Sequence, residues 1–349
     1  MNSKLKIFVL TVIMTVLFSS AVFASTVLPV TFDTELEKHI FKEMIQNKNE
    51  IDISEFNIND NFPGIVRKMR VQNPLLPKVT KAGYNKNLLI LEYDKDSENN
   101  RKRQEKVLGT ALDIVNKNID KDMDNLTRQK VLYDYLQENS TYDEVAANAL
   151  PKGATVVPEE HRDSFSAYGV LVNKKGVCGG YAEAYKILLN LAGIESIIVT
   201  GYLDNGTYHS WNKVKHGDNW YNVDVTNNYN VTGIPYLLYN TTDETAKSLG
   251  YKIDNKYWTE FDSHIFNSTD KRLDSYVVEN NIINNLEDLK SKILKSLANS
   301  NHEDFYRFEK EIPREEVKSM SLRTLEYNKS TGTHRVGLRG KFLLVQTIE

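Results

Sequence analysis

The stretch from Lys174 to Thr226 decides how this chain folds. It contains three short motifs, which are GVCGGYA (176–182), YHSWN (208–212) and WYNVDVT (220–226). One residue in each motif, Cys178, His209 and Asp224, has a side chain suited to catalysis. We expect one helix and two neighbouring strands to bring these three side chains together.

The first motif is expected to open a helix over 178–191. Apolar residues recur there at helical spacing, and Gly193 follows at the position of a helix C-cap. Cys178 then lies at the helix N-terminus, where the partial positive charge favours thiolate over thiol. Three glycines, Gly176, Gly179 and Gly180, indicate a backbone that turns sharply and approaches a ligand. The apolar positions are Tyr181, Ala184, Tyr185, Leu188 and Leu191.

The second and third motifs are expected to form a hairpin. A buried strand at 197–199 and a turn at Asp204-Asn205-Gly206 precede it. If the hairpin loop is centred between His216 and Gly217, His209 faces Asp224 with about 5 Å between their Cβ atoms. Asp224 then binds one ring nitrogen and leaves the other for Cys178, which is the arrangement of nucleophile, base and orienting group. A bulge or an odd loop would break this register.

These motifs, together with AGIES (192–196), resemble the core of the transglutaminase-like superfamily of papain-type fold. The resemblance covers roughly residues 125–230. Together with the signal-peptide pattern described below and a composition rich in Asn, Lys and Ile, it suggests a secreted bacterial member. It implies that Cys178 is the nucleophile, His209 the general base and Asp224 the orienting carboxylate. The superfamily includes protein cross-linking enzymes, peptidases, amidases and members that have lost activity.

The expected fold class is therefore α+β. A papain/transglutaminase-like core, with the nucleophile helix packed on an antiparallel sheet, is flanked by further α+β segments. We divide the chain into a signal peptide (1–24), an N-terminal accessory α+β region (25–118), a transglutaminase-like catalytic core (119–262) and a C-terminal α+β region (263–349).

The first 24 residues have the pattern of a secretory signal peptide. Lys4 and Lys6 precede an apolar stretch at 7–18, and small residues end at Ala24. The alternative is an uncleaved membrane anchor, but the apolar stretch is short for a span of about 20 residues. We expect a secreted protein, extracellular or at the cell surface, with no stable membrane span after cleavage.

Composition narrows the range of partners. The 349 residues carry a net charge of −3, which becomes −5 without residues 1–24, so nothing favours a nucleic-acid partner. The single cysteine excludes an internal disulfide. A buried structural cysteine is the alternative reading, but the glycine-flanked helix start and the downstream His209 and Asp224 weigh against it. No histidine pair or second cysteine offers a zinc site, so we expect no metal and no cofactor.

Two aromatic residues are candidates for substrate binding. Trp211 lies two residues from His209 on the same strand face. Tyr168 belongs to a segment, 164–172, whose counterparts in the superfamily line the cleft ahead of the nucleophile. A packed aromatic side chain is the alternative for Tyr168, and Trp220 is expected in the core.

The flanking segments give weaker patterns. We expect a surface loop at 151–162, a polar loop at 94–103 that leads into a helix, and a terminal β-meander. The expected helices are 36–45, 104–118, 126–139 and 286–297, and the expected strands are 87–93, 322–327, 334–338 and 342–348.

The chemistry implied is thiol acyl transfer on an amide of a protein or peptide substrate, with cell-wall peptide as one option. The thioester goes to water, as in a peptidase or amidase, or to an amine, as in protein-glutamine acyl transfer. Water needs no dedicated site, which favours a hydrolase. The alternatives are a non-catalytic extracellular binding or scaffold protein on the same fold, and an assembly protein whose thiol forms an intermolecular disulfide.

Overall fold

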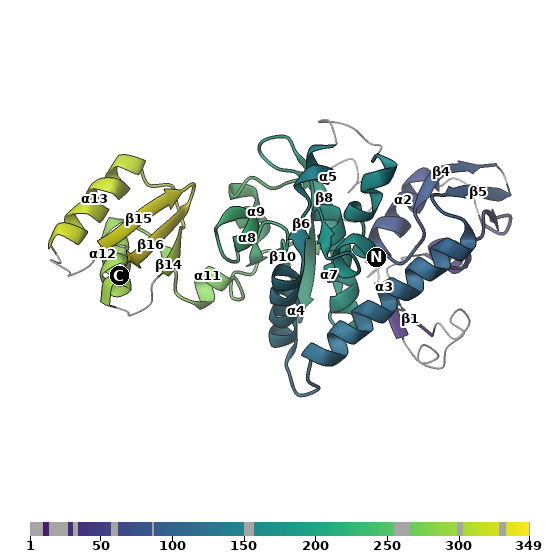
Figure 1. The fold of residues 1–349 in the computed structure, drawn as a ribbon, viewed down its shortest axis with the longest axis horizontal. Coiled ribbons are helices and arrows are strands. Elements are labelled where there is room, and N and C mark those ends of the chain that lie inside the picture. Colours follow the sequence, from purple (N-terminus) through teal and green to yellow (C-terminus); the bar gives the residue numbers. More distant parts are fainter. Residues whose placement is uncertain are drawn as a thin grey trace, which may run out of the picture.

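The computed structural model has three parts in a row, a central core between an N-terminal and a C-terminal lobe (Figure 1). It describes residues 10–13, 27–30, 34–56, 62–85, 87–149, 157–254, 266–298, 303–327 and 333–348. Most of the expected signal peptide, and residues 151–156 of the expected loop, lie outside the described residues. Strands β1 (Leu10–Ile13) and β2 (Val27–Val30) pair antiparallel. No helix in the described ranges is long and apolar enough to cross a membrane.

A five-stranded antiparallel sheet, in the order β11-β10-β9-β8-β12, forms the centre of the core. Its two longest strands, β8 and β9, join through the expected turn, where Gly206 has a φ of 80°. The strands are β8 (Ser196–Tyr202), β9 (Tyr208–His216), β10 (Asn219–Val223), β11 (Tyr239–Thr241) and β12 (Lys252–Ile253).

Helix α7 (Cys178–Leu191) has the expected bounds and packs on this sheet. It ends in a Schellman motif, because Gly193 has a φ of 81° and the N–H groups of Gly193 and Ile194 bond to the carbonyls of Asn190 and Leu189. Its buried face joins α3 (Ser97–Asn118) and α4 (Asn125–Asn139) in one apolar cluster. The α+β class and the helix-on-sheet core are thus confirmed.

The other core elements surround α7 and the sheet. They are α4 (Asn125–Asn139), β6 (Thr141–Tyr142), α5 (Glu144–Asn148), the 3-10 helix η1 (Glu159–Phe165), α6 (Ala167–Leu171), β7 (Lys175–Gly176), α8 (Tyr229–Thr232) and α9 (Asp243–Ser248).

The expected register of the β9–β10 hairpin is wrong by two residues. Asn219 pairs with His216, so the loop is centred between Gly217 and Asp218. Gly217 has a φ of 59° and makes this two-residue turn possible. Because the partners shift by two, every side chain stays on the expected face. His209 and Asp224 therefore meet as diagonal rather than direct neighbours.

The N-terminal lobe packs helices on a three-stranded sheet, β3-β5-β4. One expectation fails here, because most of the polar run 94–103 forms the first turns of α3. Asp96 caps this helix by accepting from the Asn99 N–H at 2.9 Å. These turns carry no apolar stripe, and most of their residues are exposed, although Asn100 is buried. The elements are α1 (Glu35–Ile45), β3 (Glu50–Asp52), α2 (Phe62–Gln72), β4 (Val79–Tyr84), β5 (Leu88–Tyr93) and α3 (Ser97–Asn118).

The C-terminal lobe has a four-stranded sheet, β13-β14-β16-β15, covered by helices. The expected strand at 322–327 is wrong, since these residues end a helix whose Val317, Met320 and Leu325 pack on the sheet. The elements are α11 (Ser275–Val278), β13 (Ile282–Ile283), α12 (Leu286–Ala298), β14 (Glu303–Phe308), α13 (Arg314–Tyr327), β15 (Thr333–Arg339) and β16 (Phe342–Ile348).

A small junction joins the C-terminal lobe to the core. Ile234, Tyr276 and Phe342 form an apolar cluster there. Beside it, the Arg307 guanidinium donates to the Asp274 carboxylate at 2.8 Å, and both side chains are buried. The junction therefore combines an apolar contact with a buried ion pair.

Candidate active site

Cys178 is the first residue of α7 and is partly exposed. The preceding residue, Val177, occupies the N-cap position and offers no side-chain cap. The N–H groups of the first turn are therefore not capped by that side chain, and they direct partial positive charge towards the thiol.

Glycines hold the segment 164–166 tightly against this helix start. A Cβ on Gly180 would lie 2.7 Å from the Ser164 carbonyl oxygen and 2.8 Å from that of Ser166. A Cβ on Gly176 would lie 2.5 Å from a methyl group of Val170. Neither glycine has a positive φ, so the left-handed turn that glycine usually supplies is not their role. They permit the chain's own backbone to pack closely.

His209 connects the thiol to the carboxylate. It lies on β9 with 4% of its surface exposed, and its Nε2 is 2.7 Å from Oδ2 of Asp224. Its side chain also hydrogen-bonds with that of Cys178, while the Ser210 N–H donates to the same sulfur. Since Nε2 faces Asp224, Nδ1 is the nitrogen left for the sulfur. The structure thus brings all three expected residues together.

Asp224 is fully buried, and both of its carboxylate oxygens have donors. Oδ2 accepts from His209 and from the Tyr251 hydroxyl at 2.7 Å, and Oδ1 accepts from the Thr226 N–H at 2.8 Å. Asn227 supports the network by donating its side-chain amide to the Tyr251 oxygen at 2.9 Å. This set of hydrogen-bond donors is well suited to an ionised Asp224 carboxylate.

Sequence reasoning missed Tyr251 and Asn227. Asn227 lies one residue beyond the third motif, and Tyr251 lies 27 residues after Asp224 in a polar segment without clear periodicity. Tyr251 also packs edge-on against His209 and Trp211, with ring centroids 5.8 Å and 5.3 Å away. Only the pairing of β12 with β8 brings it to the site, and no motif signals this.

The charges of the three residues support one another. Burial alone would raise the pKa of the Cys178 thiol, but the His209 charge and the hydrogen bonds to the sulfur hold that pKa below its ordinary value. Burial would lower the pKa of His209, but Asp224 and Cys178 raise it to about 10. Burial would raise the pKa of Asp224, but the attraction of His209 and the hydrogen bonds from His209, Tyr251 and Thr226 lower it. Both shifts favour a thiolate–imidazolium pair.

The two aromatic candidates lie in different places. Trp211 stacks near the His209 ring at 6.3 Å and is only 1% exposed, and it donates to Asn222. Tyr168 packs under the Arg103 guanidinium at 3.8 Å, in a pocket whose lining does not include the three residues. Their roles in substrate binding stay predictions. Trp220 packs against Phe266 in the core.

No group of three His, Cys, Asp or Glu side chains that could hold a metal ion occurs among the described residues. The polar groups around the sulfur are instead N–H donors. The Cys178 N–H, at the uncapped start of α7, is placed to stabilise an oxyanion that forms when the sulfur attacks a carbonyl. The arrangement is therefore equipped for nucleophilic chemistry by a thiolate.

Comparisons with solved structures give distant likenesses. A TGase is 13% identical, with 56% of this chain and 54% of that one covered and a TM-score of 0.31; this chain thus spans about half its length. A candidate cysteine protease from Cytophaga hutchinsonii is 20% identical, covering 35% and 37% at a TM-score of 0.26. An arylamine N-acetyltransferase from Bacillus cereus, described with a Cys-His-Glu catalytic triad, is 12% identical, covering 34% and 48% at a TM-score of 0.24.

At these identities and TM-scores, the likenesses to solved structures assign no activity to this chain. No curated protein sequence matches the chain. The family model described as the transglutaminase-like superfamily matches residues 113–225, a range that includes Cys178, His209 and Asp224. The chain therefore contains a transglutaminase-like domain over residues 113–225, as the motifs predict.

Proposed function

We propose that this protein is a secreted thiol enzyme that acts on amide bonds through a thioester at Cys178. The observation that carries the proposal is the continuous contact from Cys178 through His209 to Asp224, with Cys178 partly exposed and the other two side chains buried. A buried base beside a reachable thiol is the arrangement that nucleophilic catalysis requires.

In the first half of the reaction, the Cys178 thiolate attacks the amide carbonyl carbon. A C–S bond forms while the carbonyl π electrons move to oxygen, which the Cys178 N–H stabilises. The tetrahedral intermediate then collapses and the C–N bond breaks. Protonated His209 gives its proton to the departing nitrogen, leaving a thioester on Cys178 and a neutral imidazole.

In the second half, neutral His209 takes a proton from the acyl acceptor as this attacks the thioester. The C–S bond breaks, and the sulfur leaves as the thiolate that restores the resting pair. Water gives a hydrolase, and a lysine amine gives a cross-linking acyltransferase. We favour the hydrolase because water needs no dedicated binding site.

We further propose that the substrate is a protein or peptide outside the cell, with cell-wall peptide among the options. This part rests on the signal-peptide pattern of residues 1–24 and on the net negative charge. Nucleic acid is not among the proposed partners, and Trp211 and Tyr168 stay as proposed substrate-binding residues.

A single incubation tests the acyl transfer and identifies the acceptor. The full chain and its Cys178→Ser variant are mixed with a glutamine-rich protein and a labelled primary amine, and label incorporation, ammonia release and peptide cleavage are followed together. We expect cleavage or ammonia without label, and only with Cys178 present. Incorporated label would replace the hydrolase by an acyltransferase.

The proposal of an enzyme would fail on a different result. If neither product forms over a panel of glutamine-rich and cell-wall peptides, and mass spectrometry finds no acyl adduct at Cys178, the non-catalytic binding protein becomes the better account.

A further inference from the structure

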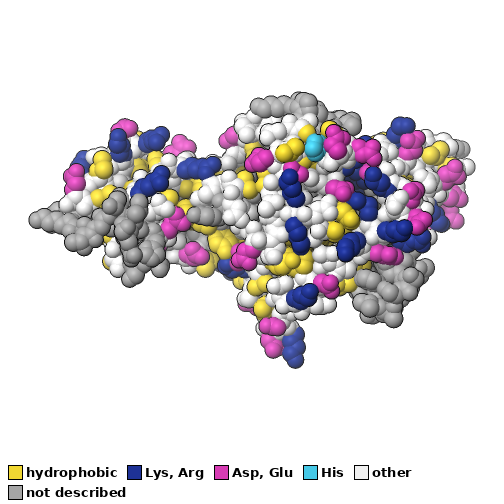
Figure 2. All heavy atoms as spheres, in the orientation of Figure 1, with side chains coloured by type: hydrophobic (Ala, Val, Ile, Leu, Met, Phe, Trp, Pro, Cys, Tyr) yellow, Lys and Arg dark blue, Asp and Glu magenta, His cyan; other side chains and the backbone are white. Residues whose placement is uncertain are grey.

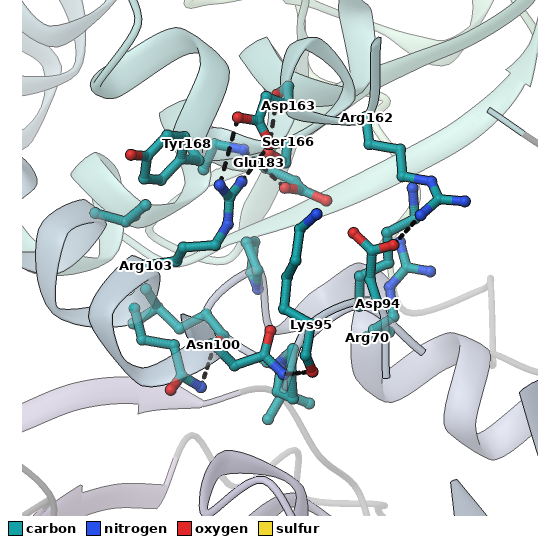
Figure 3. A pocket seen from close by; sticks show the side chains of 18 of the residues that line it. Arg70, Asp94, Lys95, Asn100, Arg103, Arg162, Asp163, Ser166, Tyr168 and Glu183 are labelled. Atoms are coloured by element: carbon teal, nitrogen blue, oxygen red, sulfur yellow. Dashed lines mark hydrogen bonds and ion pairs between the residues drawn. The ribbon is translucent and has the colours of Figure 1, made fainter. Parts of the chain in front are cut away.

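A pocket lies where the N-terminal lobe meets the core (Figure 3). The lobe supplies the last turn of α2, the segment before β4 and the start of α3, and the core supplies residues 162–168 and Glu183 of α7. Lys and Arg side chains gather on this part of the surface, with Asp and Glu among them (Figure 2). Pockets between domains are common places for ligands.

Most charged side chains around this pocket are already paired. Arg162 pairs with Asp94, and Arg103 pairs with Asp163. Figure 3 shows Lys95 reaching between these two pairs, and its ammonium group is 3.3 Å from Glu159 outside the pocket. The charges cancel within each of these pairs, and three further charged groups remain in the lining. These are Arg70, Lys78 and Glu183.

The two cations of this remaining set lack a direct partner. Within the described part of the chain, neither the Arg70 nor the Lys78 side chain makes a hydrogen bond or an ion pair, although both are partly buried. Glu183 uses one carboxylate oxygen to accept from the Ala167 N–H at 2.9 Å. The set therefore carries one positive charge in excess, in a place where water is partly excluded.

The energetics of this set favour an added anion. Burial, and then repulsion by Arg70, lower the pKa of Lys78. Burial raises the pKa of Glu183 to about 7 although Arg70 and Lys78 attract its charge. Two partly desolvated cations that repel each other raise the free energy of the folded protein. A bound anion would remove that cost and complete the hydrogen bonds of both cations.

We propose that this pocket binds a small oxyanion, a carboxylate or a phosphate group, held between Arg70 and Lys78. The guanidinium of Arg70 supplies a planar pair of donors, and Lys78 supplies a point charge. Apolar groups from Pro74, Pro77 and Phe165 complete the lining, so the ligand is a small molecule or a chain end rather than an extended polyanion.

The pocket is separate from the thiol site. Its lining does not include Cys178, His209 or Asp224. Glu183 and Cys178 are five residues apart on α7, and their side chains therefore leave the helix about 140° apart. The thiol faces β9, and Glu183 faces residues 166–168.

Calorimetric titration of the full chain at low ionic strength tests the proposal. The probes are inorganic phosphate, N-acetylalanine as a small carboxylate, and N-acetylalanine amide as its neutral analogue. We expect one saturable site for phosphate or N-acetylalanine and none for the amide. The anion that binds more tightly identifies the source of the oxyanion.

Substitutions then locate that site. Arg70→Gln and Lys78→Gln should each weaken binding by about tenfold or more, because each removes a charged donor. Lys81→Gln is the matched control, since Lys81 lies nearby but is exposed and paired with Glu92; it should leave the affinity unchanged.

Glu183→Gln should change the affinity for the anion in the opposite direction. This test does not depend on whether the first two variants fold. The amide oxygen still accepts from the Ala167 N–H, but the competing negative charge is gone, so binding should become several-fold tighter. The proposal is overturned if neither anion binds, if Arg70→Gln and Lys78→Gln bind as the wild type does, or if Glu183→Gln weakens binding.

Discussion

Two buried aspartates show how differently this molecule uses the same side chain. Asp224 in the core and Asp274 at the junction to the C-terminal lobe are 0% and 1% exposed. The pKa of Asp224 is lowered, whereas burial raises the pKa of Asp274 despite the Arg307 charge. Each carboxylate faces one cation, so the partner's charge alone does not explain the difference.

The difference lies in the other donors and in the kind of cation. Asp224 has a tyrosine hydroxyl and two backbone N–H groups in addition to His209. The cation that faces Asp224 is His209, which can gain and lose a proton. His209 also contacts the thiol of Cys178, a partly exposed residue. Asp274 faces an arginine that stays charged, and Nη1 of Arg307 has no hydrogen-bond partner among the described residues. The first pair has a partner that can exchange a proton, whereas the second is a fixed ion pair that holds the start of α11 against β14.

The largest effect is expected from Asp224→Asn. The substitution keeps the size of the side chain but removes the charge that stabilises protonated His209, and it disfavours the required tautomer. Turnover of an amide substrate should fall about 10⁴-fold, measured as kcat. Arg307→Met is the control at the other pair, and its turnover per folded molecule should equal that of the wild type. Equal losses of turnover in the two variants would contradict the difference proposed between the two aspartates.

Arg307→Met should instead destabilise the fold. It leaves Asp274 buried without its cation, at a cost of about 3–5 kcal/mol in the free energy of unfolding, measured by denaturant titration. Asp274 has a raised pKa, so its contribution is fully present below the unfolded pKa and lost as pH rises through the folded value. Losing Arg307 raises that pKa further. The destabilisation should therefore be larger at pH 8 than at pH 5, and a cost independent of pH would contradict this account.

The pH dependence of Cys178 alkylation tests the other pair. Because the pKa of Cys178 is lowered and that of His209 is raised, wild-type labelling by iodoacetamide should stay fast at pH 6. In His209→Ala the thiol loses its cation. A free thiol of pKa about 8.5 is only about 0.3% ionised at pH 6, so labelling should slow by up to about 300-fold.

The gap between the two proteins should close as the pH rises towards 9. Identical profiles would mean that Cys178 and His209 are not coupled. Failure of the wild type to label before denaturation would mean that the thiol of Cys178 is out of reach of the reagent.

The smallest effect is expected from Tyr251→Phe. The ring contacts with His209 and Trp211 stay, but Asp224 loses one hydrogen bond to its ionised form. Alkylation at pH 6 should slow by about tenfold or less, with the profile shifted to higher pH. Tyr202→Phe, which changes an exposed ring, should leave the profile unchanged. A loss of stability in Tyr251→Phe without a shift of the profile would make Tyr251 structural only.

The sequence was sufficient for the parts that local pattern determines. The bounds of α7 follow from its apolar spacing and Gly193, and the three site residues follow from their chemistry and order. The register was missed because residues 215–218 allow two loop centres, and only the turn geometry of Gly217 selects one. Tyr251 could not be found because its position depends on the pairing of distant strands. Residues 322–327 were misread because their short apolar pattern suits both a strand and the end of a helix.

Ser166 belongs to the boundary of both sites. Ser166 lines the pocket that contains Arg70 and Lys78. Its carbonyl oxygen also leaves no room for a Cβ on Gly180, in the helix turn that begins with Cys178. Packed interiors transmit displacement instead of absorbing it. A shift of a few tenths of an ångström in residues 164–166, which lie between the pocket and the start of α7, should therefore reach both sites. We therefore expect a ligand in the pocket to change the reactivity of the Cys178 thiol.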